Sequence, residues 1–335
     1  MVSTFSSDTL SSVYKDDYKD SNNYNRILFN SGRALQAREL TQMQTILQKQ
    51  IERIGNNIFK EGAVVKPGGF SVNNGYEFIK LNEASNTLAA AGDVVGKILT
   101  GSSSSISAKV IQQIVSDGGD PATLFVHYTN TASVTNAITA NDLRFTPGEN
   151  ITDGGSVTLT VQTTNTDINP AIGVGTRISV GEGIYYCKGH FVFTENQSKV
   201  VDKYKDTYSG QVGFRIDEQV VTPSDDNTLY DNQGASPNIS APGADRYRIR
   251  LVLAKDSDLT GSQNFIHLAD LTRGTISSKQ NEFDPYAIPN DVLARRIKEN
   301  SGNYIVKPFK IHYDADSESS HLLLKISDGI VVVDG

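Results

Sequence analysis

The sequence predicts a β-rich protein of several domains in the α+β class, on the basis of its length, its glycine content and its overall composition. The chain has 335 residues, whereas single hydrophobic cores usually stop growing near about 250 residues. Its 28 glycines, with Ser, Thr and Asn frequent beyond Gly62, are typical of short strands joined by tight turns. The hydrophobic fraction of 38% and the charged fraction of 21% indicate a folded chain rather than a disordered one.

Charge and termini argue against several classes of partner. The formal net charge is -7 and no tract is dense in Lys or Arg, so we expect no nucleic-acid partner. The N-terminus has neither a basic start nor an apolar run, and no stretch approaches the roughly 18 apolar residues that span a bilayer, so we expect neither secretion nor membrane insertion. A single cysteine, Cys187, leaves no intramolecular disulfide and suits a reducing cytoplasm.

Residues 1–60 are expected to form an arm followed by an amphipathic helix. The arm is polar but carries large aromatic side chains at intervals, so it is either a frayed terminus or a segment that orders against a neighbouring subunit. The helix is expected from Gly32 to about Phe59, with Asn30 or Ser31 as its cap and an end near Gly55. Its apolar residues recur mostly at three- and four-residue steps along one stripe: Leu35, Leu40, Met43, Leu47, Ile51, Ile54 and Ile58.

The stripe has two interpretations, which are packing on its own domain and self-association into a short bundle. The opposite face is rich in glutamine, which can bind a neighbour at a small desolvation cost. Arginines can make bidentate contacts to carboxylates, within the fold or across subunits. The candidate subunit interface therefore consists of Tyr14, Tyr18, Tyr24, Phe29, Arg33, Arg38, Gln42 and Gln48.

Three further segments follow the helix. Residues 61–91 and 166–216 are expected to form a β platform, and residues 92–165, which are rich in Ser, Thr, Gly and Val, an inserted small β-barrel or sandwich. Residues 217–335 are expected to form a C-terminal α+β domain, with a long exposed loop over 217–245, a strand over Arg246–Ala254 and a short helix over Asp291–Glu299.

A strand-turn pattern occurs three times, which indicates a reused β unit. The copies lie at Glu61–Val72, Gly183–Val192 and Gly329–Gly335, each with a β-branched or aromatic run beside glycines. The third copy stops where a returning strand is expected, so we interpret the chain as truncated.

No catalytic, cofactor-binding or metal-ligating constellation is predicted. The sequence contains neither a GxSxG elbow nor a GxxxxGK[ST] loop, and no second cysteine completes a thiolate site. Asp314, Asp316 and Glu318 alternate but lack the calcium-loop pattern, so a solvated turn is the preferred interpretation. The histidines also lack zinc-ligand spacing: His127, His190, His267, His312 and His321. A glycosidase pair stays open, because folding assembles such carboxylates.

Residues Phe29–Leu47, FNSGRALQARELTQMQTIL, resemble the start of an uncharacterised family of tailed-phage structural proteins, best known from cyanobacterial and marine phages. Two other segments fit the same family, GIYYCKGHFV at 183–192 and LARR at 293–296 followed by ENSGNYIVKPF at 299–309. The resemblance implies a virion component of the tail, baseplate or fibre region, within a longer polypeptide, and supplies no catalytic residues.

The sequence therefore predicts a non-enzymatic virion protein that acts in assembly as a baseplate or fibre-attachment component. The expected partners are other tail or baseplate proteins and further copies of the chain, with a trimer as one arrangement. The expected location is the tail region of the virion, after assembly in the host cytoplasm. Two alternatives are a depolymerising enzyme and a receptor- or glycan-binding module, whose candidate aromatic residues are Tyr185, Tyr186, Tyr204, Tyr208 and Tyr230.

Overall fold

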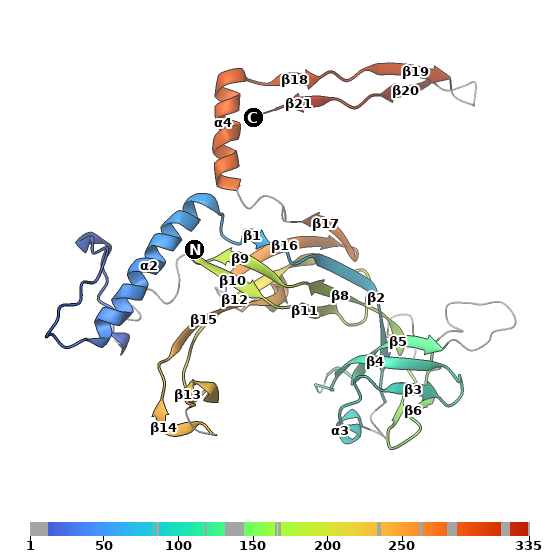
Figure 1. Ribbon diagram of the computed structural model, residues 1–335. Coiled ribbons are helices and arrows are strands. Elements are labelled where there is room, and N and C mark those ends of the chain that lie inside the picture. Colours follow the sequence, from blue (N-terminus) through green and yellow to red (C-terminus); the bar gives the residue numbers. More distant parts are fainter. Residues whose placement is uncertain are drawn as a thin grey trace. The chain divides into compact units, whose positions relative to one another are not determined.

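A computed structural model of the chain describes residues 13–82, 84, 87–117, 119–130, 144–164, 166, 169–232, 236–260, 264–279, 287–315 and 322–333. These residues fall into two compact units. The first contains the described parts of Met1–Pro67, Ile184–Phe193 and Asn281–Gly335, and the second those of Gly68–Gly183 and Thr194–Gln280. The β-rich prediction is confirmed, because several sheets and few helices make up both units (Figure 1). No described helix is long and apolar enough to cross a membrane.

The long predicted helix is α2, Ala37–Ile58. It starts at Ala37, five residues later than expected, because Gln36 and Glu39 form a reciprocal capping box in which the Gln36 N–H donates to the Glu39 carboxylate at 3.0 Å. Gly55 lies inside the helix rather than unwinding it. A short 3-10 turn over Asp20–Asn22 (η1) precedes α2 in the arm.

A three-stranded sheet accompanies α2 in the first unit, in the order β1-β9-β10. Its strands are β1 (Val64–Lys66), β9 (Gly183–Cys187) and β10 (His190–Thr194). The β9–β10 hairpin was predicted, and its two turn residues, Lys188 and Gly189, both have positive φ, +50° and +80°, as a type I′ turn requires.

The two strands predicted within Glu61–Val72 are present, but they do not pair with each other. β1 pairs with β9, whereas the next strand, β2 (Phe70–Lys80), pairs with β8 (Ile172–Val180) in another sheet. The platform segment expected over residues 61–91 is therefore divided between the two units, because β1 belongs to the first unit and β2 to the second.

The rest of the first unit is a helix followed by a long two-stranded ribbon (Figure 1). The helix α4, Ala287–Ser301, contains the predicted helix over 291–299. In the ribbon, β18 (Tyr304–Lys307) pairs with β21 (Ile330–Val332), and β19 (Ile311–Ala315) pairs with β20 (Leu322–Ile326). The third strand-turn copy thus contains β21, whose pairing partner is the earlier strand β18.

The second unit contains an eight-stranded sheet in the order β11-β8-β2-β5-β4-β3-β6-β7. Its remaining strands are β3 (Ile98–Gly101), β4 (Ser107–Ile114), β5 (Thr123–Asn130), β6 (Asn150–Thr152), β7 (Thr158–Thr160) and β11 (Gln197–Asp202), with the short helix α3 (Leu88–Ala91) beside them. Leu81 forms an isolated bridge with Val161, just beyond the ends of β2 and β7. Strand pairing therefore runs from β2 through β5, β4, β3, β6 and β7 and back to the end of β2.

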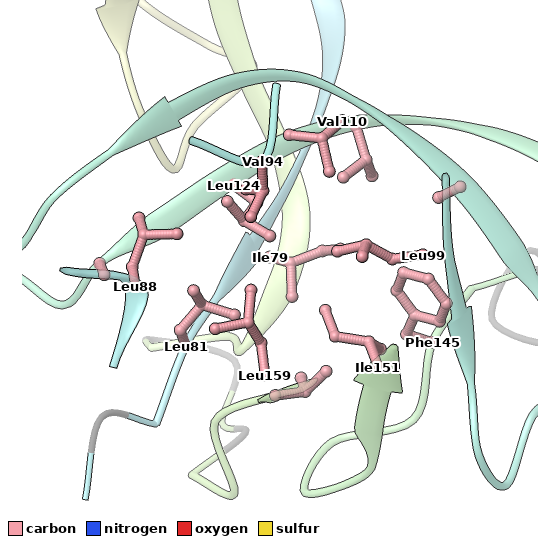
Figure 2. Packing of buried hydrophobic residues seen from close by; sticks show 14 of the residues in the cluster. Ile79, Leu81, Leu88, Val94, Leu99, Val110, Leu124, Phe145, Ile151 and Leu159 are labelled. Carbon is pink, nitrogen blue, oxygen red and sulfur yellow. The ribbon is translucent and has the colours of Figure 1, made fainter. Parts of the chain in front are cut away.

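The main apolar core fills the inside of this ring of pairing. Figure 2 shows large aliphatic side chains from its strands meeting in a common interior. Among its fully buried members are Ile79, Leu99, Leu124, Ile151 and Leu159. Since Ile79 belongs to β2, the segment over 92–165 does not bury this core alone, as an independent insert would.

A four-stranded sheet in the order β15-β12-β16-β17 completes the second unit. Its strands are β12 (Gly210–Val221), β15 (Arg246–Lys255), β16 (Phe265–Thr272) and β17 (Thr275–Lys279). The predicted loop over 217–245 is wrong in part, because β12 continues to Val221 and β13 (Tyr230–Asp231) pairs with β14 (Asn238–Pro242). Short 3-10 turns lie at Asn227–Leu229 (η3) and Asp256–Asp258 (η4).

Candidate assembly surface

The arm is held to α2 of its own chain by carboxylates. The Asp17 carboxylate accepts a hydrogen bond from the Gln42 amide at 3.0 Å and pairs with Arg38 at 3.3 Å. The buried Asp16 carboxylate accepts from the Thr45 hydroxyl at 2.5 Å. About two turns further along α2, the Arg53 guanidinium pairs with Asp20 at 2.7 Å. Residues 16–20 therefore lie on their own helix, which neither interpretation of the arm anticipated.

The β9–β10 hairpin occupies another part of the same side of α2. The Tyr186 hydroxyl donates to the Asn56 side chain at 2.8 Å and lies 3.2 Å from the Glu52 carbonyl oxygen. Gly55 makes this approach possible, because a Cβ on it would lie 2.5 Å from the Tyr186 ring. Gln48 contacts the His190 ring. Burial, with the nearby carboxylates of Glu52 and Glu61, raises the pKa of Tyr186 to about 12.

The apolar stripe of α2 faces away from these contacts and is exposed. Its exposed members are Leu40, Met43, Leu47, Ile51 and Ile54, with exposures from 37% for Met43 to 64% for Ile54. On the other side of the helix Ile46 is only 3% exposed and Gln42 is buried. The helix thus turns its polar face inward and its apolar face outward. Of the two interpretations of the stripe, packing on its own domain is wrong.

The eight candidate interface residues fall into two groups. Arg38, Gln42 and Gln48 make contacts within the chain, and the Tyr18 hydroxyl donates to Asp20 at 2.6 Å. These four side chains therefore bind residues of their own chain. Tyr14 is half-buried, and the remaining three are exposed: Tyr24, Phe29 and Arg33.

The ribbon also exposes apolar side chains. Ile305 and Val331 lie opposite each other in register, as do Ile311 and Ile326, and all four are exposed. A two-stranded ribbon has little stability in water without a packing partner. Val331 belongs to the third predicted strand-turn copy, and the run Tyr304–Val306 carries the signal of an apolar strand, but neither pattern indicates that these side chains are exposed.

The candidate glycan-binding aromatics do not form one exposed set. Tyr185 and Tyr186 are buried in β9, so neither lines an exposed groove. Tyr204 is half-buried and donates its hydroxyl proton to Asp120 at 2.6 Å. Tyr208 and Tyr230 are half-buried. Within the described part of the chain, no group of three or more His, Cys, Asp or Glu residues could hold a metal ion; Asp316 and Glu318 lie outside the described residues.

Asp120 joins the β4–β5 connection to the segment after β11. Its carboxylate accepts from Tyr204 at 2.6 Å and pairs with Lys203 at 2.5 Å. Burial alone would raise the pKa of Asp120, but the hydrogen bonds from Lys203 and Tyr204 hold it below its ordinary value of 3.8.

We expect Asp120→Asn to lower the unfolding free energy by about 1–3 kcal/mol at pH 7, because the Lys203 ammonium loses its charged partner. A carboxyl group whose pKa is lower in the folded chain than in the unfolded chain stabilises the fold above about pH 4. This stabilisation is lost as the pH falls further. The difference in unfolding free energy between the native chain and the variant, measured by urea unfolding, should therefore disappear below pH 4. Asp206→Asn, at an exposed carboxylate, should leave the curve unchanged. A gap that is constant from pH 3 to pH 7 would contradict this role.

Cys187 should be unreactive in the folded chain. The thiol is fully buried in β9, and burial, with the Glu61 carboxylate, raises its pKa to about 12 from 9.0. The thiolate fraction at pH 8 is then about a thousandfold lower than at the ordinary pKa. We expect Ellman's reagent to leave the native chain unlabelled for hours and to label it fully in urea. Rapid labelling without urea would show that β9 is not packed as described.

The fold and these contacts define a class of protein, a β-rich chain whose longest described helix exposes its apolar face. The chain belongs to the DUF4815 family, described as a domain of unknown function, whose model matches residues 12–129 and 140–335. Comparison with curated proteins and with solved structures found no match.

Proposed function

We propose that this protein is a structural component of a phage virion, in the tail, baseplate or fibre-attachment region, and that it acts in assembly rather than catalysis. The observation that carries the proposal is the exposed stripe of α2. Five large apolar side chains lie on one face of a helix whose other face is bonded to its own chain.

The energetics favour a covered stripe. Apolar surface gains roughly 25 cal/mol per Å² when it leaves water. In an isolated soluble domain, a helix normally gains this by turning its apolar face to the core. In α2 the inward positions are taken by polar contacts such as Asp16–Thr45, so rotating the stripe inward would break them. A partner can cover the stripe without disturbing the fold, which is the behaviour expected of an assembly protein.

The resemblance of Phe29–Leu47 to tailed-phage structural proteins supports the placement in a virion. We further propose that the strands from β2 to β7 act as a small β-barrel module, since the Leu81–Val161 bridge returns the pairing to β2. In this proposal the second unit presents β surfaces to which other tail modules attach.

The test is the composition of the virus particle. Particles of the phage that encodes the chain should contain it, detected by mass spectrometry of purified virions. Antibodies against the second unit should label the tail by immunogold microscopy. A chain found only in infected-cell lysate, and never in washed particles, would overturn the proposal. So would release of reducing sugars from host polysaccharide by the purified chain.

A further inference from the structure

We propose that the α2 stripe is covered by α2 of a second copy of this chain, in an antiparallel pair whose two-fold axis passes beside Leu47. The inference rests on the proposed assembly function and names the partner. It follows from the arrangement of exposed residues along the helix.

The exposed stripe is palindromic about Leu47. Leu40 lies seven residues before Leu47, and Ile54 lies seven residues after it. Met43 and Ile51 lie four residues before and after it. When two such helices run in opposite directions around a two-fold axis at Leu47, each apolar position therefore meets an apolar position of the other copy. Such self-complementarity is the requirement of an isologous interface.

Glutamines border the stripe on both flanks. Gln44 and Gln50 are both exposed and lie three residues before and after Leu47, one on each side of the stripe. An amide side chain both donates and accepts hydrogen bonds, so it can bind either kind of group on a second copy. A trimer around a three-fold axis, one arrangement expected from the sequence, would not use this palindrome.

The charges of α2 do not oppose self-pairing. Arg53 is paired with Asp20, and Lys49 is paired with Glu52 at 2.8 Å on the side that faces the chain. The stripe therefore brings no like charges together and offers no charge pattern that would select a charged partner. This favours a second copy over an acidic or basic protein.

The size of the stripe sets the strength of the pair. From Leu40 to Ile54 the helix rises about 21 Å, at 1.5 Å per residue. Five side chains from each copy cover less area than a standard interface of roughly 800 Å² per partner. We therefore expect a dissociation constant on the order of micromolar. A larger fraction of the copies should pair where the virion concentrates the chain.

Cysteine cross-linking distinguishes the arrangements. In the antiparallel pair, residue 43 of one copy faces residue 51 of the other, whereas the two copies of residue 43 lie about 12 Å apart along the axis. A disulfide requires Cα atoms within roughly 7 Å. Met43→Cys and Ile51→Cys should therefore form linked dimers when mixed under mild oxidation, and neither variant should do so alone. The native chain, whose Cys187 is buried, is the background control.

Each outcome decides the proposal. Linked dimers from the mixture alone support the antiparallel pair. Linked dimers from either variant by itself would indicate parallel helices and overturn it, and so would the absence of links in all samples at concentrations well above the micromolar range. Leu47→Cys, which faces itself across the axis, should link alone and shows that oxidation worked. A failed pairing together with particles that contain the chain would leave the proposed function standing with a different partner.

Discussion

Leu47→Glu should turn a self-associating chain into a monomer. Leu47 lies at the centre of the proposed pair and is 61% exposed in the single chain. Each pair would then bury two carboxylates against each other, and an unpaired buried charge costs several kcal/mol. We expect the dissociation constant, measured by sedimentation velocity, to rise by at least about 100-fold, which corresponds to about 2.7 kcal/mol.

The controls separate association from folding. Leu47→Met keeps an apolar side chain of similar volume and should keep the association. Asn57→Glu adds the same charge at an exposed position outside the palindrome, so it should change the dissociation constant little. Because Leu47 is 61% exposed in the single chain, Leu47→Glu should keep the thermal unfolding temperature of the isolated chain. A monomeric Asn57→Glu would mean that net charge, not the stripe, controls association.

Gly55→Ala should destabilise the first unit, although the same change usually stabilises a helix by up to about 1 kcal/mol. The new Cβ would lie 2.5 Å from the Tyr186 ring, and that ring is buried and held by its hydroxyl bonds to α2. The helix and β9 must then separate, which we expect to cost about 2–3 kcal/mol. The measurement is urea unfolding followed by circular dichroism at 222 nm.

A second substitution tests the cause. Tyr186→Leu removes the ring, and combining it with Gly55→Ala should cost clearly less than the sum of the two single changes. Gln50→Ala, at an exposed site of the same helix, should be neutral or slightly stabilising. Additive losses in the double variant would show that Gly55 does not pack against Tyr186.

The sequence predicted the elements of the fold better than their partners. The three- and four-residue spacing of apolar residues located α2, and alternation located the strand over Arg246–Ala254 and the β9–β10 hairpin. These signals are local. The pairing of β1 with β9 joins residues about 120 positions apart, and no local pattern around Pro67 distinguishes it from a hairpin with β2.

The orientation of α2 was the main point that the sequence could not give. An amphipathic stripe predicts that one face is apolar, and it says nothing of whether that face meets the core or another molecule. What turns the helix is a set of polar contacts to distant residues, among them Asp16, Asp17 and Tyr186. Gly55 is a signal of this in the sequence, since a glycine within a helical pattern often has a packing reason. A glycine near the expected end of a helix equally predicts its C-terminus, so the sequence alone does not distinguish the two.

The measurement that tests the central claim most directly is the oxidation rate of Met43, followed by mass spectrometry during exposure to dilute hydrogen peroxide. Met43 lies in the stripe and is 37% exposed in the single chain. Its thioether should be protected when copies pair, and it should oxidise several-fold faster on dilution below the dissociation constant. In Leu47→Glu the rate should be fast at every concentration, with free methionine as the reference. A native Met43 that oxidises at the same fast rate at all concentrations would contradict a stripe covered by a second copy.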